Sequence, residues 1–138
     1  MAGEGAKLGQ PEVKVGILPG AGGTQKLARL VGSKRAMLLL MTGRMFSAAE
    51  AFNMGVVSEI APTGQALVRA LEIAREIAAL SPISIMQIKE IVNAGLNAPL
   101  ETALMLERKA FQLQFATSDQ KEGMRAFMEK RKPKFEGK

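Results

Sequence analysis

The sequence predicts a mostly helical α/β fold with few and short strands. Three observations support this prediction: apolar residues recur at helical spacing through most of the chain, Gly and Pro mark the ends of successive helices, and only two short segments have strand character. With 138 residues, 47% of them hydrophobic, the chain is long enough to form one domain with a core of its own.

The first predicted element is a short extended segment near the N-terminus. Residues 13–18 are largely apolar and are bounded by Pro11 and Pro19, which favours a brief strand. The glycines that follow, from Gly20 onward, allow backbone conformations closed to other residues and let a ligand approach the main chain. Thr24 is then expected to cap a helix, whose free N–H groups can hold an anion or a water molecule.

The next three helices are separated by glycines and by a capping pattern. Glycine commonly stands just past the end of a helix, so Gly32 and Gly43 are expected to end the first two. Ser47 and Glu50 have the spacing of a capping box, which predicts a short third helix ending near Gly55. The predicted helices cover 24–31, 33–41 and 48–54, and a strand is expected at 56–60.

The remaining chain predicts four longer helices. Apolar residues repeat every three or four positions from 64 to 80, and Pro82 behind Ser81 has the pattern of a new helix start. Asp119 with Glu122 imitates another capping box. These helices are expected at 64–80, 82–93, 100–115 and 119–131, and the third has two apolar faces, which indicates burial between partners.

Three long segments carry a family resemblance: GQPEVKVGILPGAGGTQKLARLVG at 9–32, TGRMFSAAEAFNMGVVSEI at 42–60 and FATSDQKEGMRAFMEKRKPKF at 115–135. In this order and spacing they resemble the enoyl-CoA hydratases of the crotonase superfamily. The resemblance spans nearly the whole chain and roughly the C-terminal half of such an enzyme. It implies a crotonase-like fold, here its mostly helical C-terminal portion.

The resemblance also implies an activity and a site. The family adds water to 2-enoyl-CoA to give 3-hydroxyacyl-CoA, a lyase reaction of fatty acid β-oxidation. Glu12 matches the proton-donating glutamate, and Gly20 matches the backbone amide that contacts the reacting water. Lys130 matches a lysine that meets the adenine end of CoA, and Phe111 an aromatic that approaches the CoA of a neighbouring subunit. By spacing alone Phe111 is better explained as helix core, and Glu12 alone would be a solvated glutamate.

The resembled enzymes suggest how the chain is organised. Residues 1–60 are expected to form part of the crotonase core with the catalytic glutamate and glycine loop, and residues 61–138 a helical region for site cover and oligomerisation. The expected partners are an acyl-CoA substrate, the missing N-terminal half and further copies, as a trimer or a dimer of trimers when complete. Because the oxyanion donors and the other glutamate lie in that missing half, the chain alone is expected to be inactive.

Composition excludes several kinds of chemistry. The chain has no Cys and no His, which excludes a Ser-His-Asp triad, a Cys-His pair and the usual zinc ligand sets within it. No metal and no prosthetic group is expected, and the substrate is carried as a coenzyme A thioester. No run reaches the roughly 18 apolar residues of a membrane span, so a soluble protein is expected, cytoplasmic in a bacterium or in the mitochondrial matrix of a eukaryote.

Two alternatives remain open. An enoyl-CoA isomerase of the same superfamily can move a proton with one glutamate at the position of Glu12. A non-catalytic CoA-binding, RNA-binding or assembly module is also consistent with the net charge of +6, which fits either an anionic partner or plain solubility. Nucleic acid is the weaker partner, because only 4% of residues are aromatic and neither Tyr nor Trp occurs to stack on bases.

Overall fold

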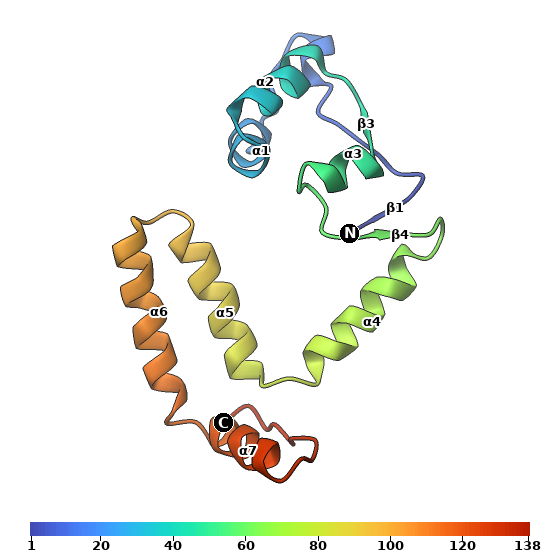
Figure 1. Cartoon of the computed structure of the whole chain (residues 1–138). Helices are drawn as coiled ribbons and strands as arrows, with labels where there is room; N and C mark the ends of the chain where they lie inside the picture. The colour runs from blue at the N-terminus through green and yellow to red at the C-terminus, as the bar shows by residue number, and fades with distance from the viewer. The chain divides into compact units, whose positions relative to one another are not determined.

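Seven α-helices, one short 3₁₀ helix and four two-residue strands make up the structure, a computed structural model that describes residues 1–138 (Figure 1). The chain forms two units, Met1–Glu72 and Ile73–Lys138. The helix α4 (Ala66–Ala78) runs across the boundary between them. No helix combines the length and the apolar character needed to cross a membrane.

The first unit is built on a pair of helices and two minimal sheets. The helices α1 (Gly23–Val31) and α2 (Ser33–Thr42) pack against each other, and α3 (Ala48–Asn53) follows. The strands pair far along the chain: β1 (Ala2–Gly3) lies parallel to β4 (Ile60–Ala61), and β2 (Lys7–Leu8) antiparallel to β3 (Phe46–Ser47). These pairings tie the N-terminal residues to the segment that follows α2.

A small apolar core holds this unit together. Leu27 of α1 and Leu39 of α2 meet in it, together with Phe46 of β3. The whole buried cluster comprises Leu27, Ala36, Leu39, Phe46, Ala51 and Val57. Each of the two helices buries only one stripe, Leu27 on α1 and Ala36 with Leu39 on α2, and these stripes join them.

The predicted strand at 13–18 is wrong. Glu12–Val15 form the 3₁₀ helix η1, in which the Lys14 N–H donates to the Pro11 carbonyl at 2.9 Å and the Gly16 N–H to the Val13 carbonyl at 3.1 Å. Gly16 ends it in the left-handed conformation, with φ 79°. Only two-residue strands pair in this unit and none pairs with this segment; the N–H groups of Lys14, Gly16 and Ile17 bond to nearby carbonyls instead.

The predicted strand at 56–60 is mostly wrong as well. The N–H groups of Val56 and Val57 donate to the carbonyl of Ala51 at the end of α3, at 2.8 and 3.4 Å, and only Ile60 belongs to a strand. The preceding helix thus uses the donors that a strand would need.

The structure confirms the predicted N-cap of α3 and corrects that of α1. Ser47 and Glu50 form the full capping box of α3, with the Ser47 side chain accepting from the Glu50 N–H and the Glu50 side chain from the Ser47 N–H. At α1, by contrast, the N-cap is Gly22 in the left-handed conformation and not Thr24, and no side chain caps the helix. The glycine permits this sharp entry, so the helix starts one residue before Thr24.

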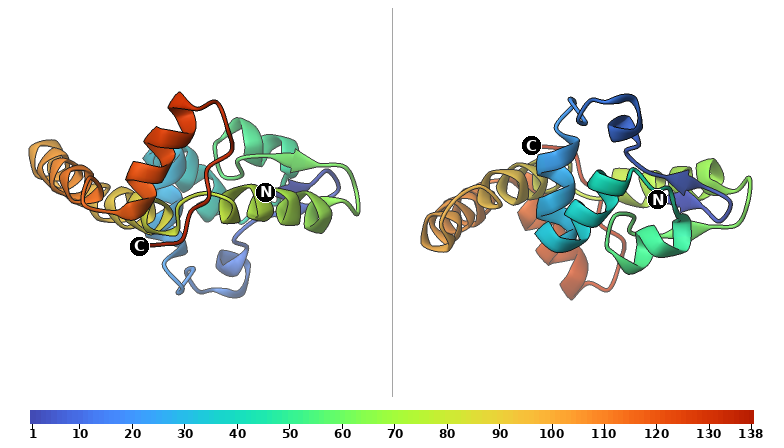
Figure 2. Two further views of the ribbon diagram at one scale, coloured as in Figure 1. Left: turned by 90° about the horizontal axis from the view of Figure 1, so that it is seen from below. Right: turned by 90° about the horizontal axis from the view of Figure 1, so that it is seen from above.

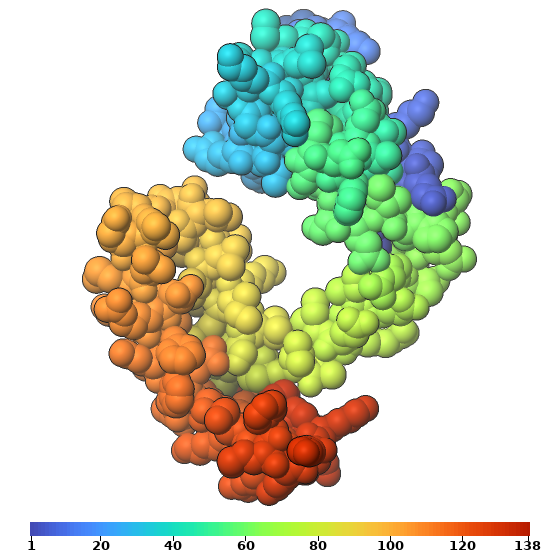
Figure 3. All heavy atoms as spheres, in the orientation of Figure 1, coloured from blue at the N-terminus to red at the C-terminus, as the bar shows by residue number.

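The second unit is a helical hairpin followed by a short helix and a tail. The hairpin helices α5 (Pro82–Gly95) and α6 (Leu100–Gln114) lie side by side, as Figures 1 and 2 show, and Figure 3 shows their atoms in contact. Polar side chains join them where Ser84 donates to Gln114 at 2.8 Å and Gln114 donates to Gln87 at 3.3 Å. Ser81 caps α5 as predicted.

The last helix, α7 (Ser118–Met128), begins earlier than predicted. Thr117 is its N-cap and accepts from the Gln120 N–H at 3.1 Å, so the prediction of Asp119 as the cap is wrong. Asp119 is instead buried and bonds to residues far along the chain. The prediction fails for two reasons. Thr117, two residues upstream, caps the helix instead, and the Asp119 carboxylate bonds to partners that are distant in sequence.

Candidate functional site

Glu12 stands at the start of η1, where Pro11 and the 3₁₀ turn set its backbone. Its side chain is half-buried, and its Oε2 atom is buried without any hydrogen-bond partner. Buried polar atoms without partners are rare in proteins, because each one loses its hydration and gains nothing in return. Glu12 therefore has the burial and the free acceptor of a group that meets a ligand.

Gln10 lies two residues before Glu12 and shares this property. Its Oε1 atom is also buried without a partner, and its side chain rests on Gly23 at the first turn of α1, where a Cβ would collide with it. Gly23 is itself buried. This glycine thus has a packing role, while the sequence alone associated the whole glycine cluster with ligand approach.

Gly20 has the opposite environment. It is exposed, and a Cβ built on it would meet nothing within 4 Å. The backbone of the loop is therefore open to an approaching molecule at Gly20. The expected approach of a ligand to the main chain at Gly20 requires such an opening and stays a prediction.

Gly20 also lies on an open apolar groove of about 760 Å³. Ile17 and Leu18 of the loop form one part of its lining, and Met41 of α2 forms another; these three side chains are 61%, 69% and 72% exposed. The complete lining is Val13, Gly16, Ile17, Leu18, Pro19, Gly20, Thr24, Leu40 and Met41. Val13, the residue that follows Glu12, is part of this lining, so the groove can accept an apolar group next to Val13.

Phe111 lies on α6 in the second unit and is 64% exposed. Its ring stacks edge-on against Phe115, with centroids 5.1 Å apart and planes at 75°. It lines two shallow grooves, one with Leu104 and Arg108 and one with Ile88 of α5. Phe111 is therefore not part of a buried core within this unit, and its ring is free to contact a ligand or another chain.

Lys130 follows α7 and has a left-handed backbone conformation, φ 53°, which is uncommon for a residue with a side chain. Its N–H donates to the Phe127 carbonyl at 3.2 Å, and its side chain is exposed. The next residue, Arg131, is held by two hydrogen bonds to Glu122, at 2.6 and 3.0 Å. The ammonium group of Lys130 therefore projects from a chain segment that is fixed on its C-terminal side.

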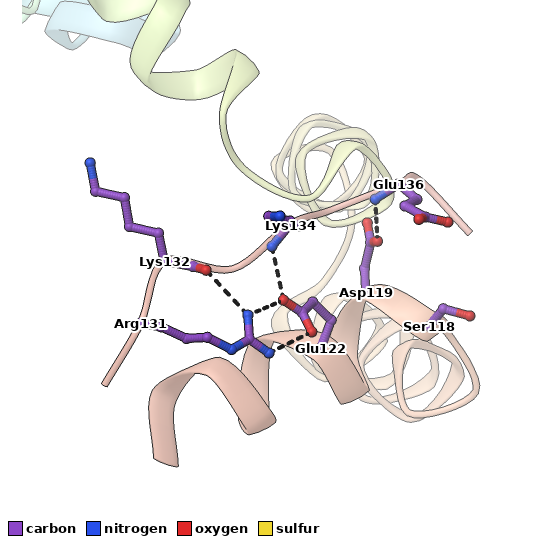
Figure 4. A pocket seen from close by; sticks show the side chains of 7 residues that line it. All are labelled: Ser118, Asp119, Glu122, Arg131, Lys132, Lys134 and Glu136. Atoms are coloured by element: carbon purple, nitrogen blue, oxygen red, sulfur yellow. Dashed lines mark hydrogen bonds and ion pairs between the residues drawn. The ribbon is translucent and has the colours of Figure 1, made fainter. Parts of the chain in front are cut away.

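The tail after Lys130 folds back over the start of α7 and forms a pocket of about 530 Å³ (Figure 4). Arg131 and the Lys134 N–H both bond to Glu122, while the Lys132 ammonium extends away from this ion pair (Figure 4). The hydrogen bond from Arg131 and that from the Lys134 backbone lower the pKa of Glu122 to about 2. Glu122 stays charged at neutral pH and anchors the tail.

Asp119 provides the second anchor of the tail. Its carboxylate accepts from the Ser81 hydroxyl at 2.8 Å, from the Glu136 N–H at 2.8 Å and from the Gly137 N–H at 3.1 Å. Burial acts to raise the pKa of Asp119, but the hydrogen bonds from Glu136, Ser81 and Gly137 outweigh it, and the pKa lies below its ordinary value. Sequence reasoning missed this cluster, because Ser81 lies 38 positions before Asp119 and the tail donors lie 17 and 18 positions after it.

The predicted site residues fall into the two units. Glu12 and Gly20 lie in Met1–Glu72, while Phe111 and Lys130 lie in Ile73–Lys138. Gln10 was not predicted, and its only signal in the sequence was its place inside the segment that carries the family resemblance.

Comparison with known proteins identifies the family. A model for enoyl-CoA hydratase/isomerase matches residues 1–138. A probable mitochondrial enoyl-CoA hydratase of Dictyostelium discoideum is 44% identical over 138 residues, which are all of this chain and 50% of the relative. The mitochondrial enoyl-CoA hydratase of Pongo abelii is 46% identical over 134 residues, 97% of this chain and 46% of that protein.

Solved structures agree with this. An enoyl-CoA hydratase of Bacillus anthracis is 42% identical with a TM-score of 0.95, over 99% of this chain and 53% of the other. The chain spans about half the length of the curated relatives it matches. Its fold is the mostly helical portion of the crotonase-like fold. The chain therefore belongs to the enoyl-CoA hydratase/isomerase family.

Proposed function

We propose that this chain supplies the proton-donating half of an enoyl-CoA hydratase, which adds water to 2-enoyl-CoA to give 3-hydroxyacyl-CoA. The observation that carries the proposal is the Oε2 atom of Glu12, buried and without a partner. In a family named for this reaction, a carboxylate left unpaired beside an open glycine loop is the group to expect at the reacting atoms.

The chemistry assigns a separate role to each residue. Glu12 delivers the proton to the α carbon of the thioester, while the N–H of Gly20 holds the reacting water. The developing enolate oxygen needs paired N–H donors, and the water needs a second carboxylate as its base. Both come from polypeptide corresponding to the other half of the relatives. Because those groups are required, the chain by itself has no turnover.

The rest of the chain binds the substrate and assembles the enzyme. Lys130 meets the adenine end of coenzyme A, and Phe111 approaches the CoA of a neighbouring subunit. No prosthetic group takes part, because the thioester itself activates the substrate. Residues 1–60 then belong to the catalytic core, and 61–138 cover the site and form the oligomer, a trimer or a dimer of trimers.

The metabolic setting follows from the same proposal. Hydration of 2-enoyl-CoA is a step of fatty acid β-oxidation. Curated relatives include a probable enoyl-CoA hydratase of Rhizobium meliloti and mitochondrial enoyl-CoA hydratases. We therefore assign the reaction to the cytoplasm if the source is bacterial and to the mitochondrial matrix if it is eukaryotic.

Loss of crotonyl-CoA absorbance on hydration tests the proposal. The chain is assayed alone and then with a polypeptide corresponding to the other half. Turnover is expected only from the pair, and Glu12→Gln is expected to abolish it, because the amide cannot donate the proton. Glu4→Gln is the matched control, since Glu4 is exposed and lies in the same unit. Full activity of the Glu12→Gln pair refutes the role of Glu12.

The family description also covers isomerases, which move a double bond without adding water. A 3-enoyl-CoA substrate given to the same pair separates the two reactions. Conversion to 2-enoyl-CoA without hydration makes the enzyme an isomerase. Absence of both reactions, with an RNA gel shift that weakens steeply as salt rises, favours the non-catalytic alternative.

A further inference from the structure

Gly43 ends α2 at a point where it touches the segment that carries Glu12. It is buried and has the left-handed conformation φ 57°, ψ 27°, and its N–H donates to the Leu39 carbonyl at 3.0 Å. A Cβ at this position would lie 2.9 Å from Cγ1 of Val13, and 3.3 Å from Cγ and Cε of Lys14. Both neighbours belong to η1, and Val13 directly follows Glu12.

The two contacts differ in how easily they yield. The Lys14 side chain is long and exposed and can move aside at little cost. Val13 is branched at Cβ, so its methyl groups are held close to the backbone in a strongly preferred rotamer. An added Cβ at Gly43 therefore acts on the main chain of η1 through Val13, and η1 is the turn that places the Glu12 carboxylate.

We propose that Gly43 is a positioning residue for Glu12: the missing side chain lets η1 lie close against the end of α2, and this contact sets where the carboxyl group stands. The inference rests on the proposed function of Glu12. It assigns to Gly43 a role beyond ending the helix, which is the only role that the sequence pattern indicated for it.

The test compares Gly43→Ala with Gly55→Ala in the reconstituted pair. Gly55 also has positive φ, 76°, but a Cβ there meets nothing within 4 Å, so both variants carry backbone strain and only one adds a contact. We expect Gly43→Ala to lower kcat for crotonyl-CoA about tenfold to a hundredfold, because a misplacement of about 1 Å in catalytic groups has effects of that order. The KM should change less than about threefold, since the groups that bind CoA lie elsewhere. Gly55→Ala should keep both constants.

A second variant keeps the test decisive if Gly43→Ala folds poorly. Val13→Ala removes the Cγ1 atom that the new methyl would strike, so Gly43→Ala/Val13→Ala should fold and recover a kcat close to that of Val13→Ala alone. Rescue of this kind is not expected if Gly43 matters only for the left-handed turn, because the double variant keeps that strain.

The outcomes distinguish the inference from the function on which it rests. If Glu12→Gln abolishes turnover while Gly43→Ala keeps the kcat of Gly55→Ala, the positioning role of Gly43 is wrong and the role of Glu12 stands. The positioning role of Gly43 is also wrong if Gly43→Ala/Val13→Ala has a kcat as low as that of Gly43→Ala, or is as poorly folded. If Glu12→Gln is fully active, the proposed role of Glu12 and the positioning role of Gly43 are both wrong.

Discussion

Replacement of Ser81 by alanine tests how the C-terminal tail is held. Ser81 is 8% exposed and acts twice: its Oγ caps α5 by accepting from the Ser84 N–H at 3.5 Å, and it donates to Oδ2 of Asp119 at 2.8 Å. Ser81→Ala removes both bonds and leaves the two tail N–H groups of Glu136 and Gly137 as donors to the carboxylate.

The size of the effect follows from these two bonds. A lost serine N-cap costs roughly 0.5–2 kcal/mol, and the long 3.5 Å distance places Ser81 at the low end of that range. A hydrogen bond to a charged group contributes about 1.5–3 kcal/mol. The lower end of this range applies here, because the Asp119 carboxylate still accepts from the N–H groups of Glu136 and Gly137. The sum is about 2 kcal/mol. With a slope of roughly 2 kcal/mol per molar urea, the unfolding midpoint should fall by about 1 M.

Urea unfolding followed by far-UV circular dichroism measures this shift, since the chain has neither Trp nor Tyr to report by fluorescence. Ser118→Ala is the matched control: Ser118 is exposed, lines the tail pocket next to Asp119, and its hydroxyl makes no hydrogen bond. In the Ser81 variant, the amides of Glu136 and Gly137 should also exchange faster with solvent. A midpoint that moves no further than that of Ser118→Ala would refute the reasoning.

Two further predictions concern the tail and the loop. Because the pKa of Glu122 is lowered from 4.5 to about 2 by Arg131 and the Lys134 N–H, its contribution to stability is present above pH 4.5 and is lost as the pH falls toward 2. Exchange protection of the Lys134 amide should follow that titration, and Glu122→Gln should remove this contribution and leave the acid dependence that comes from Asp119. Gly20→Ala should leave thermal stability within about 0.5 kcal/mol, because the Cβ meets nothing, yet lower crotonyl-CoA turnover at least about tenfold by filling the approach to the loop. Unchanged turnover would contradict the role of Gly20.

Local signals in the sequence were sufficient for most helices. The capping box at Ser47 and the Ser81–Pro82 start each involve residues at most three positions apart, and the structure confirms both. Such signals act within one turn of the chain, where residues that are close in sequence are also close in space. The same reasoning failed at Asp119, whose pattern with Glu122 imitates a cap. The deciding partners there come from Ser81 and from the tail, which no local pattern reveals.

The strands and the site were harder to predict. A strand exists only through its partner, and all four strands here have two residues and pair over long distances in sequence. The apolar run at 13–18 has no such partner and forms turns, which places Glu12 on a 3₁₀ helix. For the site, the resemblance pointed to Glu12 and Gly20. It could not show that Gln10 rests on Gly23, because that contact depends on how α1 begins.

Two carboxylates of this chain, the proposed proton donor Glu12 and the tail anchor Asp119, differ in the number of hydrogen bonds that they accept. Each is withdrawn from solvent, but Asp119 accepts hydrogen bonds from Ser81, Glu136 and Gly137, whereas Oε2 of Glu12 accepts none. A carboxylate saturated with donors is held in its charged form and fixed in place, which suits an anchor and not a proton donor. A buried carboxylate oxygen without donors has lost its hydration and has gained no hydrogen bond in exchange. This free-energy cost is recovered only when a ligand binds to it. The number of donors around each group, more than its burial, therefore distinguishes Asp119, which holds the tail, from Glu12, and it supports the proposed contact of Glu12 with the substrate.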